Sequence, residues 1–462
     1  MAMDLSLPPS VVRRNKLDIS LGYCNDIQPN RLLSLGPVYE VRVDNPDHLI
    51  DLLVHDAVDG CAYFVNHFRA KEKEWEYVCF ARSEEWTIFC SIFSTALAYN
   101  PLFADGRRRR LCSGGTRIIG KDDLQQALHR PLSDPAEELQ QALLMNLDLS
   151  EAMTGKNLSN GFNIGGSKTL VYVTGQPGNG KHIPAERARE FAAFMARFHN
   201  SIAQSLPLFI GTGSDLNFSE HGNLYYDLCS RLSPSYVGNP LAARRWGRET
   251  DEDTTIPTAK GVVASIDAVS TYLDLQGDQR SILIKGLGGV GLLVARHYVE
   301  EGWKVYATDI DAKKLERARE ELGAAVTPVE EMNWDRIPAV KIFSPNSSSG
   351  SLTRENLPLL KNLGVQAVVG GENNIRDKHL DADFIYEETG ILIFADFLLN
   401  GGGAWIVDAE MVERAVEDVE DWIESYQVPT VRRTIELAKE LDRSPESIFT
   451  DFIQRKVKEL VA

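Results

Sequence analysis

The chain has 462 residues and a formal net charge of −17 at pH 7. This length leaves room for two domains, each with its own core. The acidic balance argues against nucleic acid and against an anionic membrane surface as partners. The sequence contains no apolar run of membrane-spanning length and no signal-peptide pattern, so we expect no membrane contact and a cytoplasmic location.

Two minor features complete the composition. The basic run Arg107–Arg110 stands out from the acidic background. We interpret it as a solvated loop, with contact to an anion or a partner as the alternative. The cysteines lack the paired spacing of a metal site, so we expect reduced thiols and no bound metal at the six positions Cys24, Cys61, Cys79, Cys90, Cys112 and Cys229.

The first half of the chain mixes strand and helix patterns. Residues 1–35 contain several prolines and little periodicity, and we expect them to be poorly structured. Apolar and polar runs alternate over 41–98, which predicts a mostly β region. Leucines recur at helical spacing over 122–153, which predicts helical structure. A strand at Thr169–Thr174 and a helix at Ala185–Ser205 follow.

The second half alternates strands and helices. The polar, acidic segment Trp246–Pro257 predicts a hinge, and a helix is expected at Ala259–Leu275. Residues 409–461 are charged and read as helical. Between them lie five short apolar runs that predict a parallel sheet, at Ile282–Ile284, Lys304–Ala307, Val340–Phe343, Ala367–Val369 and Ile391–Phe394.

The segment from Ser281 to Asp311 has the pattern of a dinucleotide-binding unit. Its glycines follow the spacing GxGxxG directly after an apolar run. Gly286 permits the tight turn, Gly288 lets the backbone approach a pyrophosphate, and Gly291 lets the helix lie close to the strand. The N-terminus of that helix offers free N–H groups to phosphates. Gly289 and Val290 complete the turn.

The second apolar run of this unit ends at Asp309, which is followed by Ile310. A carboxylate at this position accepts hydrogen bonds from the adenosine ribose and repels a 2′-phosphate, so the sequence predicts NAD in preference to NADP. The alternative is a glycine-rich turn that binds nothing.

Two lysines form the next candidate site. Lys156 and Lys168 lie twelve residues apart, and Lys168 stands between a glycine pair and an apolar strand. Burial and a neighbouring cation both lower the pKa of a lysine toward that of a usable base. The alternative is two ordinary surface lysines. Asp215 ends the glycine-rich segment Gly211–Asp215, which predicts a turn with an acid in it.

The segment Gly175–Lys181 fits the spacing GxxxxGK of a phosphate-binding loop. The next residue is His182, however, where magnesium needs a serine or threonine hydroxyl. We interpret the segment as a polar loop and keep a P-loop nucleotide hydrolase as an alternative.

Taken in order over roughly residues 110–455, these segments resemble the glutamate/leucine/phenylalanine/valine dehydrogenase family. The likeness is to its leucine, phenylalanine and tryptophan dehydrogenase-like branch, with a longer N-terminal region. The matching segments are Gly114–Arg117, Met153–Asn157, Gly165–Lys168, Asp215, Thr258–Gly261, Gly286–Gly291 with Asp309, Gly371–Asn374 and Asp396–Gly403.

The resemblance implies an NAD-dependent enzyme that converts an L-amino acid reversibly to its 2-oxo acid and ammonia. Lys156 would pair with the substrate carboxylate. Lys168, kept neutral, would activate the water that attacks the imine carbon. Asp215 would carry the proton to and from the amino group. A non-catalytic or regulatory NAD-binding homologue remains an alternative.

The resemblance also implies residues around these groups. Thr258, Asn373 and Asn400 would hold the nicotinamide end and the substrate amine. Gly114 and Met153 would line the substrate site. Where glutamate-specific members carry a lysine that binds a side-chain carboxylate, this sequence has Ser113, which predicts an apolar or aromatic amino acid as the substrate.

The expected fold class is α/β, with an N-terminal α/β substrate domain and a C-terminal Rossmann NAD-binding domain. The active site is expected in the cleft between them, and a homo-oligomer is expected from the family. The predicted segments are 1–35, poorly structured; 36–255, for substrate and oligomerisation; 256–430, for the dinucleotide; and 431–462, helices that pack back on the first domain.

Overall fold

The computed structural model describes residues 37–43, 45–70, 73–93, 108–128, 130–174, 183–215, 217–218, 254–329, 337–347, 349–377, 379–411 and 418–461, with Leu5, Leu35 and Tyr225 besides them. The chain divides into two compact units. The N-terminal unit comprises residues 9–251, 407–415 and 460–462, and the C-terminal unit comprises 1–8, 252–406 and 416–459. The domain limits expected from the sequence stay predictions.

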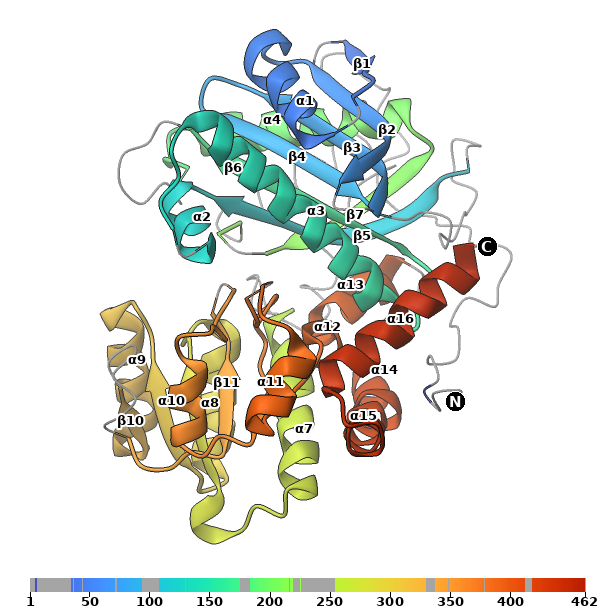
Figure 1. Ribbon diagram of the computed structural model, residues 1–462. Helices are drawn as coiled ribbons and strands as arrows, with labels where there is room; N and C mark the ends of the chain where they lie inside the picture. Colours follow the sequence, from blue (N-terminus) through green and yellow to red (C-terminus); the bar gives the residue numbers. More distant parts are fainter. Residues whose placement is uncertain are drawn as a thin grey trace. The chain divides into compact units, whose positions relative to one another are not determined.

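The N-terminal unit is built on a seven-stranded mixed sheet (Figure 1). Strands β2, β3, β4 and β6 are antiparallel neighbours, whereas β6, β5 and β7 run parallel. The spatial order is β1 (Val38–Glu40), β2 (Ala62–Ala70), β3 (Lys73–Arg82), β4 (Trp86–Ile92), β6 (Gly165–Val173), β5 (Arg110–Ile119) and β7 (Leu208–Ser214).

Helices cover both faces of this sheet. On one face, α3 (Pro135–Ser159) contributes Leu143 and Leu147 to a core with Leu170 of β6. On the other face, α4 (Ala188–Ser205) contributes Phe191 to a core with Val171. Figure 1 shows α3 lying along the sheet. The remaining elements of the unit are α1 (Pro46–Asp51), the π-helix η2 (Leu52–Asp56) and α2 (Lys121–Leu128).

The helical structure expected over 122–153 is confirmed, and it is divided between two helices. The first, α2, ends at Leu128, and α3 begins after Asp134, whose side chain accepts a hydrogen bond from the Glu137 N–H at 2.9 Å. Pro135 occupies the first turn of α3, where a proline is tolerated but its preceding residue is kept out of the helix. Helix α3 then continues past Lys156.

The mostly β region expected over 41–98 is confirmed among its described residues, although it also contains helical turns. Strands β2, β3 and β4 lie where the alternation predicted them, but α1 precedes them. Asn45 caps this helix by accepting a hydrogen bond from the His48 N–H at 2.9 Å, and Pro46 opens its first turn. These are local signals that the alternation does not contain.

The glycine-rich segments around the candidate lysine and acid belong to strands rather than turns. Strand β6 begins at Gly165, so Lys168 lies inside the strand instead of at its mouth. Strand β7 runs to Ser214, and Asp215 follows directly. The glycines permit close approach of backbones, since a Cβ at Gly114 would lie 1.7 Å from the Ser167 carbonyl oxygen.

The solvated loop expected at Arg107–Arg110 is wrong for its last two residues. Arg109 is buried, and Arg110 opens β5 and forms an ion pair with Glu76 at 2.7 Å. Arg107 lies outside the described residues. The described cysteines carry free thiols, at Cys61, Cys79, Cys90 and Cys112.

The C-terminal unit is built on the parallel sheet that the alternation predicted, with six strands where five were expected. The strand order is that of the doubly wound Rossmann fold. The chain adds strands in one direction from β8 to β10 and in the other direction from β11 to β13. The α/β fold class is therefore confirmed. In spatial order the strands are β10 (Val326–Pro328), β9 (Lys304–Thr308), β8 (Ser281–Lys285), β11 (Ile342–Pro345), β12 (Ala367–Val368) and β13 (Leu392–Ile393).

Helices surround this second sheet. Helix α7 (Thr255–Tyr272) begins four residues before the expected start and packs against α8 and α15. The last residues of α13, from Val407, are grouped with the N-terminal unit. The others are η4 (Gly277–Gln279), α8 (Gly289–Glu300), α9 (Ala312–Leu322), η5 (Gly323–Ala325), α10 (Leu357–Asn362), α11 (Ala382–Thr389), α12 (Asp396–Leu399), α13 (Gly402–Met411), α14 (Asp418–Trp422), η7 (Ile423–Gln427), α15 (Val428–Leu441) and α16 (Pro445–Val461).

Most of the hinge expected at 246–257 lies outside the described residues. Within the described part of the chain, none of the helices is both long and apolar enough to span a membrane.

Candidate functional site

The candidate base and acid meet in the N-terminal unit. The Nζ of Lys168 on β6 donates a hydrogen bond to Oδ2 of Asp215, which follows β7. The Nε of Arg117 on β5 donates to the same oxygen at 3.2 Å. Lys168 and Arg117 are each 4% exposed, whereas the Asp215 side chain that they share is 21% exposed.

This environment lowers the pKa of Lys168 to about 8. Burial is the main cause, and the charges of Arg117 and Lys156 act in the same direction. The hydrogen bond and negative charge of Asp215 oppose the shift. A lysine with a pKa near 8 is partly neutral under mildly alkaline conditions and can then accept a proton.

The sheet fixes this pair from several sides. The Nδ2 of Asn146 on α3 donates to the Lys168 carbonyl at 2.9 Å, and the Asp215 N–H donates to the Thr116 carbonyl at 3.1 Å. Gly115 lies beneath the pair, because a Cβ there would be 3.2 Å from the Lys168 Nζ. A larger residue at position 115 would displace the lysine.

The second lysine of the motif is also buried. Lys156 lies in the last turn of α3 and is 8% exposed, and Met153 lies one turn earlier. The next residue, Asn157, donates through Nδ2 to the Ser113 Oγ at 3.0 Å. Both lysines are thus more buried than surface lysines, and the structure brings Ser113, Met153 and Lys156 into the same unit as Lys168.

An acid that the sequence reasoning missed completes this group. The Oγ of Ser113 donates to Oδ1 of Asp408 at 2.5 Å. Burial raises the pKa of Asp408 to about 7, against the lowering effects of the Ser113 hydrogen bond and the charge of Lys156. The available signal was an acid within the otherwise apolar stretch Trp405–Ala409.

The predicted dinucleotide turn lies in the C-terminal unit, between β8 and α8. Gly286 has φ +90°, in the left-handed region that favours glycine. A Cβ at Gly291 would lie 1.9 Å from the Gly286 carbonyl oxygen, so helix and turn are in direct backbone contact. A Cβ at Gly288 would meet nothing within 4 Å. Open space over Gly288 fits the approach of a pyrophosphate.

The groups around this turn also fit a dinucleotide. Helix α8 has no side-chain cap at its N-terminus, where Gly289 and Val290 supply N–H groups. Asp309 accepts hydrogen bonds from the Leu287 N–H at 2.7 Å and the Asp311 N–H at 2.8 Å. A carboxylate retains further lone pairs for ribose hydroxyls. Ile310 beside it is 67% exposed.

The remaining predicted cofactor and substrate residues gather at the carboxyl edge of the Rossmann-like sheet. Asn400 donates through Nδ2 to the Gly371 carbonyl at 3.1 Å and to Oδ1 of Asn373 at 3.0 Å. Its own Oδ1 is buried and has no partner among the described residues. The Oγ1 of Thr258 donates to the Thr254 carbonyl at 2.9 Å. The amide oxygen of Asn400 therefore remains as an acceptor for a ligand.

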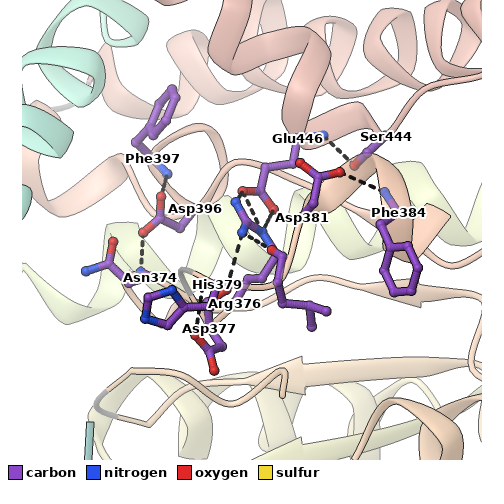
Figure 2. Close-up of polar contacts among 11 residues, drawn as sticks. Asn374, Arg376, Asp377, His379, Asp381, Phe384, Asp396, Phe397, Ser444 and Glu446 are labelled. Atoms are coloured by element: carbon purple, nitrogen blue, oxygen red, sulfur yellow. Dashed lines mark hydrogen bonds and ion pairs between the residues drawn. The ribbon is translucent and has the colours of Figure 1, made fainter. Parts of the chain in front are cut away.

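Polar contacts hold this edge in place (Figure 2). Asp396 accepts a hydrogen bond from the Asn374 N–H at 2.6 Å, which ties the segment after β12 to α12. Arg376 forms an ion pair with Glu446 of α16 at 2.7 Å. Burial affects both partners, and the pKa of Glu446 is raised mainly by desolvation despite Arg376.

Glu372 is a second acid to which the sequence reasoning gave no role. It is 1% exposed and accepts hydrogen bonds from the Ser347 N–H at 3.2 Å and the Ser351 N–H at 2.8 Å. Both serine hydroxyls donate to it as well. Glu372 thus fastens the serine-rich loop after β11 to the segment after β12.

The structure assigns the predicted residues to two sets. Lys168 and Asp215 lie in the N-terminal unit with the substrate candidates Ser113, Gly114, Met153 and Lys156. Asn400 lies in the C-terminal unit with Thr258, Asn373, the glycine turn and Asp309. The alternative phosphate loop Gly175–Lys181 lies outside the described residues.

Comparison with known proteins agrees with this arrangement. The sequence pattern of the glutamate/leucine/phenylalanine/valine dehydrogenase family matches residues 251–451. Over 300 residues the chain is 31% identical to phenylalanine dehydrogenase from Lysinibacillus sphaericus, a match that covers 63% of this chain and 72% of that protein. Over 333 residues it is 27% identical to leucine dehydrogenase from Bacillus cereus, covering 71% of this chain and 78% of that protein.

A solved structure supports the same fold. L-tryptophan dehydrogenase from Nostoc punctiforme matches with a TM-score of 0.53 at 21% identity, over 83% of this chain and 94% of that chain. The 31% identity over 72% of the phenylalanine dehydrogenase, together with the family match, shows that the protein belongs to the glutamate/leucine/phenylalanine/valine dehydrogenase family of amino acid oxidoreductases.

Proposed function

We propose that this protein is an NAD-dependent L-amino acid dehydrogenase that reversibly deaminates an apolar or aromatic amino acid to its 2-oxo acid and ammonia. The observation that carries the proposal is the buried Lys168, whose pKa is lowered to about 8 beside Asp215. A buried lysine paired with an acid in this way supplies a base and a proton carrier at the same place.

The residues of the N-terminal unit would perform the proton chemistry. Lys156, close enough to Asp408 to influence its pKa, would bind the substrate carboxylate. Asp215 would take a proton from the amino group, and Lys168 in its neutral form would take one from the water that attacks the imine carbon. NAD, when bound, accepts the hydride from the α-carbon. Positioned acid–base groups contribute about 10²–10⁴-fold to such a reaction.

The residues of the C-terminal unit would hold the cofactor. The open backbone at Gly288 and the uncapped start of α8 suit the pyrophosphate. The Asp309 carboxylate suits the ribose hydroxyls and disfavours a 2′-phosphate, so NAD is the proposed cofactor. Asn373 and Asn400 would orient the nicotinamide end and the substrate amine.

The substrate class follows from what surrounds Ser113. This residue is neutral and its hydroxyl is bonded to Asp408, so the site offers an acid rather than a cation to the side chain of a substrate. A side-chain carboxylate would be repelled, which excludes glutamate from the proposal. We also propose a cytoplasmic homo-oligomer.

The experiment is a scan of the common L-amino acids with NAD and with NADP at alkaline pH, in which NADH formation is followed by absorbance. Lys168→Ala should reduce the rate of turnover by at least about two orders of magnitude. Lys181→Ala is the matched control, because it should remove activity only in a P-loop nucleotide hydrolase. NAD binding without turnover of any amino acid would favour the non-catalytic homologue.

A further inference from the structure

Asp408 is a buried carboxylate with only one of its two oxygens satisfied. The residue is 0% exposed, and its neighbours Val407 and Ala409 are apolar. Oδ1 accepts the hydrogen bond from Ser113, but Oδ2 has no partner among the described residues. Leaving a buried acceptor without a donor costs free energy, so this oxygen points to a group that a ligand supplies.

A chain of hydrogen bonds fixes which oxygen remains available. The Ser113 Oγ accepts from Asn157 Nδ2 at 3.0 Å, so its own proton is directed to Oδ1 of Asp408. Asn157 is held in turn by the Ile164 and Gly165 carbonyls, at 3.3 and 3.1 Å. The orientation of the carboxylate is therefore set by the protein, and Oδ2 is left as the acceptor.

Asp408 shares a face of the sheet with the reactive pair. Alternate residues of a strand point to the same side, so Ser113, Gly115 and Arg117 of β5 face one way. Gly115 lies under the Lys168 Nζ, whereas Ser113 contacts Asp408. Two residues of a strand span roughly 7 Å, which is the reach of an amino acid side chain.

On this face of the sheet, two facing glycines form a floor without side chains beside the Lys168 Nζ. Gly115 of β5 is paired in register with Gly213 of β7. A Cβ at Gly213 would lie 3.6 Å from Cγ2 of Val407, the residue before Asp408. Val407 of α13 therefore lies over this floor, and the next residue, Asp408, contacts Ser113 beside it.

The charges nearby indicate the kind of donor. Lys156, Lys168 and Arg117 already place three basic groups on this side of the sheet, against the two acids Asp215 and Asp408. With Lys168 neutral, as the proposed function requires, the two remaining cations and the two acids balance in charge. A neutral N–H or O–H donor satisfies the free oxygen without adding charge.

We propose that Asp408 is a specificity-determining residue whose Oδ2 accepts a hydrogen bond from a neutral N–H or O–H donor at the end of the substrate side chain. The inference rests on the proposed function and narrows its substrate class, from apolar or aromatic amino acids to aromatic ones with such a donor. Tyrosine is the simplest probe, with phenylalanine as its match without a donor.

The test compares this pair in the wild type and in Asp408→Val, which keeps a branched side chain but removes the acceptor. The kcat/KM with NAD is measured for L-tyrosine, L-phenylalanine and L-ornithine. Calorimetry measures the dissociation constants of 3-(4-hydroxyphenyl)propanoate and 3-phenylpropanoate, which do not react. The control is Ser201→Ala, because this buried hydroxyl of α4 donates its hydrogen bond within its own helix, to the Arg197 carbonyl at 2.8 Å.

The wild type should prefer tyrosine over phenylalanine, and the hydroxylated acid over its match, by roughly tenfold or more. Asp408→Val should bring both ratios close to one, whereas Ser201→Ala should leave them unchanged. Equal values for the two probes in the wild type would overturn the inference, even if the variant fails to fold. A preference for ornithine would overturn it as well.

The two readouts separate this inference from the proposed function. Turnover of amino acids without a preference for tyrosine that depends on Asp408 would contradict this inference and leave the proposed dehydrogenase function in place. Selective binding of the hydroxylated acid without turnover of any amino acid would contradict the proposed dehydrogenase function and leave the role of Asp408 in place.

Discussion

Arg117 controls the charge of the candidate base without being a base itself. Its guanidinium shares the Asp215 carboxylate with Lys168, and its charge helps to lower the pKa of that lysine. Because a protonated Lys168 cannot accept a proton, kcat/KM for deamination should rise with pH and level off above a pKa near 8.

Removing the guanidinium should move this profile. In Arg117→Gln the repulsion on Lys168 is lost, so its pKa should rise and the inflection should shift to higher pH. Arg117→Lys should restore most of the wild-type profile, since it returns the charge. The measurement is kcat/KM from pH 6 to 11, and an inflection that stays in place in Arg117→Gln would contradict this role.

At this scale the sequence revealed residues that lie within short motifs. Lys156 and Lys168 could be picked out because glycines and an apolar run surround them in the chain. Asp408 could not, because its partner Ser113 is 295 residues away and only the fold brings them together. Glu372 could not be connected with its partners Ser347 and Ser351 either, because these lie 25 and 21 residues before it in the chain.

At the scale of elements, two glycines of the nucleotide turn should respond differently to alanine. A Cβ at Gly288 meets nothing within 4 Å, whereas one at Gly291 would lie 1.9 Å from the Gly286 carbonyl. Gly288→Ala should therefore keep the melting temperature and weaken NAD binding, because the methyl group occupies the space for the pyrophosphate. Gly291→Ala should lower both the melting temperature and the affinity for NAD.

Calorimetric titration with NAD and a thermal melt measure these effects. If Gly288→Ala bound NAD as tightly as the wild type, the pyrophosphate would not approach the turn there. A melting temperature unchanged in Gly291→Ala would mean that α8 shifts from the turn at no cost.

His199 joins two elements of the N-terminal unit. On α4, it contacts Thr169 of β6 through Nε2 at 2.9 Å and the Tyr225 hydroxyl through Nδ1 at 2.5 Å. Burial lowers its pKa from 6.5 to about 3. As the pH falls below 6.5, His199 binds a proton in the unfolded chain but stays neutral in the folded chain. The free energy of unfolding therefore decreases progressively toward pH 3.

His199→Gln should therefore be less stable at pH 7 but lose less stability on acidification than the wild type. Urea unfolding at pH 7, 6 and 5 measures the slope, and the exposed His48→Gln is the control. Parallel pH dependences for wild type and His199→Gln would refute the assignment.

Secondary structure was predictable where apolar residues form a continuous run. Five of the six strands of the parallel sheet lay at or beside the apolar runs, because buried strands are continuous in the sequence, whereas β10 was not predicted. The break between α2 and α3 was missed, since leucine spacing continued across Pro131 and Pro135. The start of β6 was missed because its glycines resemble a turn, although they serve close packing of strands.

At the scale of the whole molecule, the sequence identified the Rossmann-like unit more completely than the mixed sheet. Parallel strands joined by helices follow a fixed order, so the alternation alone predicts the topology. The order of the N-terminal sheet places β6 between β4 and β5, a crossover that local patterns do not encode. The grouping of Val407–Ala415 with that unit likewise required the structure.

The central claim is that the buried Lys168–Asp215 pair deaminates an amino acid while NAD is reduced. The most direct measurement follows NADH, ammonia and 2-oxo acid together, from the best L-amino acid of the scan, in the wild type and Lys168→Ala. We predict that the three products form in equal amounts in the wild type and are lost in the variant. NADH formed without ammonia, or undiminished turnover in Lys168→Ala, would contradict the account.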